Sequence, residues 1–118
     1  MNIEELREYC LAKPGTTEEL PFGPDTLVFK VMGKMFALTG LDEFDFVNLK
    51  CDPQKAIELR EKFEGITPGY HMSKKHWNSV KTDGSIPDSK IQYLVNHSYE
   101  LVVASLPKKL KEELRSFE

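Results

Sequence analysis

The segment Gly69–Val80 concentrates the residue types in this chain that can do chemistry. It holds two of the three histidines, His71 and His76, together with the only tryptophan and a pair of lysines. No acidic residue occurs in Gly65–Thr82, although the whole chain carries a net charge of −3. Positive charge interleaved with aromatic rings is suited to contact with phosphates and nucleobases.

We therefore predict that a hairpin, Tyr70–Asn78, contacts DNA. Lysines and histidines would hold phosphates, and an aromatic ring would stack on a base or wedge into a groove. A small number of phosphate contacts would give weak, salt-sensitive binding. The residues predicted to make contact are Tyr70, His71, Lys74, Lys75, His76, Trp77, Asn78 and Lys81, with Lys34 at a second turn as a second wing.

Two alternatives compete with DNA for the same segment. In one, the face binds another protein or a small metabolite, with Trp77, Tyr70 and Phe22 as anchors. Such binding would survive moderate salt. In the other, the segment is a solvated turn and Trp77 fills the core beneath it.

Metal binding and catalysis have weaker support. His71 and His76 are five residues apart, so on a strand their side chains would point to opposite faces. The chain has no His-Glu-x-x-His motif, and its two cysteines are not paired in sequence. Asp83-Gly84-Ser85 lacks a nucleophile elbow and indicates a turn. We predict a binding protein, not an enzyme, with no metal and no cofactor.

The composition is that of one globular domain spanning residues 1–118, with 40% hydrophobic and 30% charged residues. The longest aliphatic run, Leu101–Ala104, is too short to cross a bilayer, and the N-terminus is acidic where a signal peptide would be basic. Cys10 and Cys51 are expected to be free thiols in a reducing compartment. We expect a cytoplasmic protein without a membrane partner, either a monomer or a weak dimer.

The hydrophobic pattern predicts an α+β fold. A first helix starts at an Asn2–Glu5 capping box and stops at Pro14-Gly15, after which 15–25 forms a loop that Leu20 and Phe22 pin to the core. Helices covering one face of a five-stranded, mostly antiparallel sheet are expected in the order α, three strands, α, two strands, α, α. The expected strands are 26–31, 35–41, 45–51, 70–72 and 77–82; the later helices follow Asp52-Pro53, Pro87-Asp88 (with Asp88 as cap) and Pro107.

Several motifs, in order along the chain, resemble the MmcQ/YjbR family. They are Pro21-Phe22-Gly23-Pro24-Asp25, Gly33-Lys34-Met35-Phe36-Ala37, Leu49-Lys50-Cys51-Asp52-Pro53, Gly69-Tyr70-His71-Met72-Ser73-Lys74-Lys75-His76-Trp77, Asp83-Gly84-Ser85 and His97-Ser98-Tyr99. The resemblance covers essentially the whole chain. It implies a fold similar to frataxin/CyaY-like and secretion-chaperone-like proteins, and a double-wing DNA-binding motif in a small bacterial cytoplasmic protein. The iron binding of frataxins is not implied, because their acidic ridge has no clear counterpart here.

Overall fold

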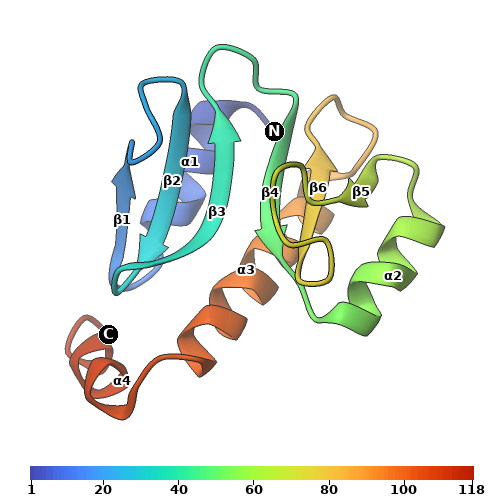
Figure 1. Cartoon of the computed structure of the whole chain (residues 1–118). Helices are drawn as coiled ribbons and strands as arrows, with labels where there is room; N and C mark the ends of the chain where they lie inside the picture. The colour runs from blue at the N-terminus through green and yellow to red at the C-terminus, as the bar shows by residue number, and fades with distance from the viewer.

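A six-stranded antiparallel sheet forms the centre of the computed structural model, which describes all 118 residues (Figure 1). The strand order across the sheet is β1-β2-β3-β4-β6-β5, and every neighbouring pair is antiparallel. In chain order the elements are α1 (Ile3–Leu11), β1 (Thr16–Glu19), β2 (Thr26–Val31), β3 (Lys34–Gly40), β4 (Phe46–Lys50), α2 (Pro53–Lys62), β5 (Ile66–Pro68), β6 (Trp77–Lys81), α3 (Asp88–Ala104) and α4 (Lys108–Arg115).

One hydrophobic core lies between the sheet and the helices. Its buried members include Leu6 of α1, Leu59 of α2, Val95 of α3 and Leu114 of α4, packed against strand residues such as Phe36. The predicted α+β class, with helices on one side of the sheet, is confirmed. No helix covers the other side, which we call the open face; in Figure 1 α1 and α3 lie behind the sheet and the open face is toward the viewer. None of the helices has both the length and the apolar character needed to cross a bilayer.

The predicted count of five strands is wrong by one. Residues Thr16–Glu19, assigned from the sequence to a loop, form the edge strand β1 and pair with β2 in the register Thr16↔Val31. Polar Thr-Thr-Glu-Glu carries no apolar alternation, so it gives no strand signal. Ion pairs help to hold β1 in place instead: Glu18 pairs with Arg7 of α1, and Glu19 pairs with Lys30 of β2.

The fifth expected strand is also shifted. It was predicted at 70–72, whereas β5 is Ile66–Pro68 and pairs with β6 through Ile66↔Val80. Pro68 is tolerated because β5 is an edge strand that does not need every backbone N–H. His71, at φ 57°, has a left-handed backbone that cannot continue a strand.

The local helix and turn signals are largely confirmed. Asn2 and Glu5 form both bonds of the capping box, and the Asp52 carboxylate caps α2 with Pro53 in its first turn. Asp88 does not cap α3: the cap position is Pro87, and the Asp88 carboxylate instead pairs with the amino group of Met1 at 2.7 Å.

The central seam of the sheet, between β3 and β4, joins only three residue pairs, from Ala37↔Leu49 to Thr39↔Val47. At one end of this seam the buried Ser98 hydroxyl of α3 accepts the Lys50 N–H at 2.9 Å and donates to the Phe36 carbonyl at 2.6 Å. Ser98 thus connects the two strands where their backbones would otherwise pair. Its small side chain also lets α3 approach the sheet closely.

Replacing Ser98 by alanine should lower the free energy of unfolding by about 1–3 kcal/mol, because it leaves a buried N–H and a buried C=O without a partner. Urea denaturation measures the change. The control is Ser105→Ala, since the exposed Ser105 hydroxyl bonds only a carbonyl of its own helix. Equal stability of the Ser98 and Ser105 variants would show that the bridge does not support the seam.

Candidate ligand-binding site

A loop on the open face, Gly69–His76, carries most of the predicted contact residues; we call it the His71 loop. Arg60 of α2 fixes the base of this loop. Its Nε donates to Asn78 Oδ1 at 2.7 Å, and a terminal nitrogen donates to the carbonyls of Lys74 and Trp77. The loop therefore has a defined position relative to the sheet.

Buried polar side chains hold the backbone of Tyr70 on both sides. The Tyr70 N–H donates to Ser79 Oγ at 2.9 Å, and the Tyr70 carbonyl accepts from Asn48 Nδ2 at 3.1 Å. Ser79 in turn donates to Asn48 Oδ1, which closes a ring of hydrogen bonds. Because the backbone is held in this way, the Tyr70 ring projects outward and is 57% exposed.

Trp77 lies beneath the loop and is only 8% exposed. It packs with Val28 and Leu38 in a small apolar cluster, and Met72 covers part of it. Gly69 is needed at this point because an added Cβ would lie 2.7 Å from Trp77 Cβ. Trp77 is therefore part of the floor of the open face, and its ring does not reach a nucleobase.

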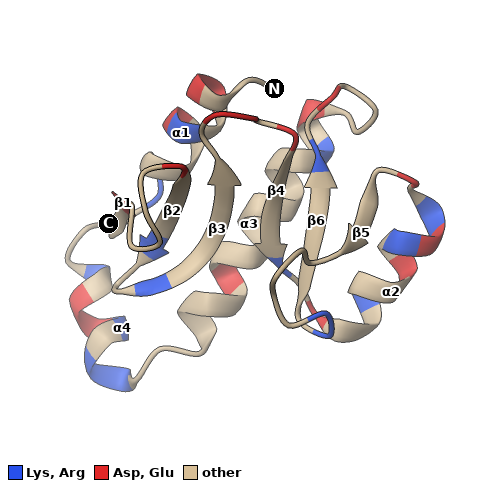
Figure 2. Ribbon diagram, turned by 45° about the horizontal axis from the view of Figure 1, so that its top comes forward, with Lys and Arg blue, Asp and Glu red and all other residues tan.

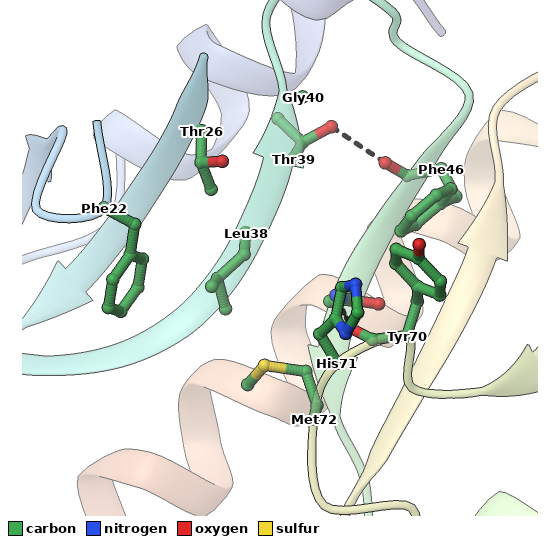
Figure 3. A pocket seen from close by; sticks show the side chains of 10 residues that line it. Phe22, Thr26, Leu38, Thr39, Gly40, Phe46, Tyr70, His71 and Met72 are labelled. Carbon is green, nitrogen blue, oxygen red and sulfur yellow. Dashed lines mark hydrogen bonds between the residues drawn. The ribbon is translucent and has the colours of Figure 1, made fainter. Parts of the chain in front are cut away.

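A hollow of about 430 Å³ opens on the open face between the His71 loop and β3 (Figure 3). The Tyr70 ring lies 4.0 Å from the His71 ring and packs edge-on against Phe46 at 5.9 Å, measured between centroids. Phe22, predicted to pin a loop to the core, is instead 63% exposed and lines this hollow. The lining residues are Phe22, Thr26, Leu38, Thr39, Gly40, Phe46, Asn48, Tyr70, His71 and Met72.

His71 holds its place in this lining with a backbone that a histidine rarely adopts. Its φ of 57° is in the left-handed region, which costs an L-residue other than glycine of order 1 kcal/mol. Strained residues of this kind are concentrated at functional sites, where the surrounding structure supports them.

The predicted cationic residues separate into two groups. Lys75 and His76 are exposed at the end of the loop, and Lys34 is exposed at the β2–β3 turn. Lys74 folds back so that its ammonium donates to the Gly69 carbonyl at 3.0 Å. Together with Lys81 it lines a second hollow of about 200 Å³, formed by Phe46, Thr67, Pro68, Tyr70, Lys74, Ser79 and Lys81. Asn78, 2% exposed, is engaged with Arg60 and is not free to contact a ligand.

Charge is distributed unevenly along the sheet. In Figure 2 the acidic residues of the β3–β4 connection lie at one end of the strands, and the lysines of the His71 loop lie at the other. At the acidic end, the neighbouring Asp42 carboxyl raises the pKa of Asp25. A polyanion would therefore be attracted to one end of the open face and repelled from the other.

The remaining titratable groups lie away from this site. His97 accepts the Asp52 N–H at Nε2 with a length of 3.2 Å, on the helix-covered side. Both cysteines are free and buried; burial raises the pKa of the Cys10 thiol to about 12 and that of Cys51 to about 11, so neither is a reactive thiolate at neutral pH. No three side chains of His, Cys, Asp or Glu converge as metal ligands.

The chain is similar to several known proteins. A family model described as YjbR matches residues 11–101. The chain belongs to the YjbR family. It is 44% identical to the uncharacterized protein YbdF of Escherichia coli O157:H7, covering 95% of this chain and 93% of that protein. It is 37% identical to the uncharacterized protein YjbR of Escherichia coli strain K12, covering 97% and 98%.

Solved structures extend the likeness to the fold. A crystal structure of a Deinococcus radiodurans protein superposes with a TM-score of 0.89 at 38% identity, covering 96% of this chain and 87% of that one. A Pseudomonas syringae protein superposes with a TM-score of 0.73 at 30% identity, covering 86% and 98%. The fold of this chain is therefore shared with experimentally determined structures.

Sequence analysis of this YjbR-family chain missed the residues that position the site. Arg60 lies four residues after the buried Ala56 and so on the same face of α2, but an arginine in a helix is ordinarily expected to face water. Asn48 and Ser79 gave no signal, because their roles depend on a register that brings β4 and β6 together. Phe46 was expected only as a strand residue.

The pH dependence of stability should report on His97. Burial, followed by the nearby Lys55 ammonium, lowers the pKa of His97 below its ordinary value of 6.5. Below about pH 6.5 the unfolded chain then binds a proton that the folded chain does not, so the free energy of unfolding falls as the pH falls toward the folded pKa. Denaturation at about pH 7.5 and about pH 5.5 should show this loss, and His97→Gln should reduce it.

The control for this experiment is His76→Gln, which replaces an exposed histidine. A pH dependence that is identical in the His97 variant and the unmodified protein would contradict the assignment.

Proposed function

We propose that this protein is a binding module and that its ligand occupies the hollow between Phe22 and Tyr70 on the open face. The observation that carries the proposal is the hollow itself, which is walled by two aromatic rings that are each more than half exposed. Concave sites with apolar walls and few polar groups are typical of small-molecule binding, and about 430 Å³ is within their usual range.

The polar groups around the hollow are suited to recognition. The Tyr70 hydroxyl, the His71 ring and the Thr26 hydroxyl have no hydrogen-bond partner within the protein, so they are available to a ligand. The lining contains no carboxylate or thiol beside His71 that would make a nucleophile–base pair. We therefore assign binding to this site and no catalytic step. The free thiols of Cys10 and Cys51 support a place in a reducing compartment such as the cytoplasm.

Planar aromatic compounds should shift backbone amide signals around the hollow. We would titrate indole and adenosine into ¹⁵N-labelled protein and follow residues of β3, β4 and the His71 loop. Tyr70→Ala and Phe22→Ala should each weaken binding by about fivefold to tenfold, because each removes one stacking surface. The matched control is Phe117→Ala, another exposed phenylalanine, located after α4.

A third variant, His71→Gly, separates binding from folding. It removes the left-handed strain together with one ring of the wall, so the protein should be at least as stable while binding is weaker. Perturbations scattered over the surface, or binding unchanged in all three variants, would refute the proposed site.

A second candidate function is the weak DNA contact expected from the sequence and from the double-wing motif that the family resemblance implies. It is supported by the acid-free surface from 65 to 82, with Lys75 and His76 exposed at its tip. Lys34 is the first residue of β3 and lies at the same end of the sheet as the start of β6, where the His71 loop ends. The burial of Trp77 and Asn78 and the internal bond of Lys74 reduce the number of contacts to fewer than the sequence alone indicated.

Fluorescence anisotropy of labelled duplex DNA should detect this contact at low salt. Raising the salt from about 20 to about 200 mM should weaken it, because phosphate contacts release counterions. Lys75→Glu should lower the affinity and flatten the salt dependence, while Lys109→Glu on α4, also exposed, should change neither. Equal losses in the two variants would mean that net charge alone, and not the His71 loop, governs the interaction.

A further inference from the structure

The two hollows of the open face share one wall. Phe46 and Tyr70 line both of them, so the hollows lie on opposite sides of the same pair of rings. The first, of about 430 Å³, is aromatic and contains no lysine, arginine or carboxylate. The second, of about 200 Å³, contains two lysines and three hydroxyl-bearing residues, Thr67, Tyr70 and Ser79. A ligand that fills both would need a planar, uncharged part and an anionic part.

The two lysines of the second hollow are free to hold an anion. Neither Lys74 nor Lys81 forms an ion pair with a carboxylate. The bond from the Lys74 ammonium to the Gly69 carbonyl fixes its position and leaves its other protons available. The carboxylate nearest in sequence to Lys81 is Asp83, whose pKa is lowered chiefly by hydrogen bonds from Ser85 and to a smaller extent by the charge of Lys81; the two side chains form no ion pair. Two ammonium groups and the exposed Thr67 hydroxyl in one small hollow are suited to a phosphate.

The first hollow is suited to a nucleobase. The Tyr70 and His71 rings, 4.0 Å apart, and the exposed Phe22 ring provide stacking surfaces, and every base has a π face. The Tyr70 hydroxyl and the Thr26 hydroxyl provide donors and acceptors for the edge of a base.

We propose that the two hollows form one bipartite site for a nucleotide unit, with the base against Tyr70 and His71 and the phosphate between Lys74 and Lys81. This inference rests on the proposed binding function and names its ligand class. A nucleotide unit is available from two sources, a free mononucleotide or one residue of a single strand, and both present the same base and phosphate. Duplex DNA does not, because its bases are stacked inside the helix.

The test compares four probes by isothermal titration calorimetry at low salt: AMP, adenosine, inorganic phosphate and a short oligo-dA strand. AMP should bind about tenfold more tightly than adenosine, because only AMP reaches the lysines. Lys74→Gln/Lys81→Gln should remove this difference and leave adenosine binding unchanged. The matched control is Lys108→Gln/Lys109→Gln, two exposed lysines of α4. Tyr70→Ala should weaken AMP and adenosine equally.

The outcomes separate this inference from the proposed function. If adenosine binds at the hollow and AMP binds no more tightly, or if the Lys74/Lys81 variant binds AMP normally, the bipartite site is refuted while the aromatic site stands. If neither adenosine nor AMP binds and indole shifts no amide of the hollow, the proposed function itself fails. If the bipartite site is correct, comparable affinities for AMP and oligo-dA identify a mononucleotide site, whereas much tighter binding of oligo-dA, lost in the same double variant, identifies a single strand.

Discussion

The sheet depends on a short central seam. β3 and β4 pair through three residue pairs, and at each end a side-chain hydroxyl replaces the ladder: Ser98 bridges Lys50 and Phe36, and Thr39 donates to the Phe46 carbonyl at 2.8 Å. The open-face hollow lies over its Thr39 end. The position of the hollow therefore depends on the same β3–β4 pairing that α3 supports from the helix-covered side through Ser98.

Polar side chains on the open face replace a helix as the support for the site. A sheet face without a covering layer is usually solvated and poorly defined in its loops. Here Asn48 and Ser79 are buried and use their hydrogen bonds on the backbone of Tyr70, and Arg60 reaches from α2 to the other end of the same loop. Because these groups would be costly to leave unpaired, the loop is held in one arrangement. The Tyr70 ring can then stay more than half exposed while one edge packs against Phe46.

Much of the framework was accessible from sequence, because local signals and the global fold agree. The Asn2–Glu5 capping box, Asp52-Pro53 and the alternation of 26–31 each specify an element without reference to the rest of the chain. The missed strand β1 is polar. It is held by backbone pairing with β2 and by the ion pair between Glu18 and Arg7, and neither interaction can be recognised from the periodicity of hydrophobic residues. The segment selected from the sequence lines the hollow on the open face, but Trp77 and Asn78, two of the residues predicted to make contact, are buried. Trp77 drew attention to the segment because it is the only tryptophan of the chain. A tryptophan can either pack in a buried cluster or stack on a ligand, and the pairing register of β6 determines which of the two Trp77 does.

The two edges of the sheet limit how copies of the chain can meet. β5 has three residues and ends in Pro68, which offers no N–H to a new strand, and β1 has four residues and carries Glu18 and Glu19. Short, charged or proline-containing edges oppose the addition of further strands. Continuous intermolecular sheets, the route by which exposed β-structure forms fibrils, are therefore disfavoured at both ends. One whole face of the sheet is left without a covering layer, but the edges of the sheet do not favour the addition of a second copy.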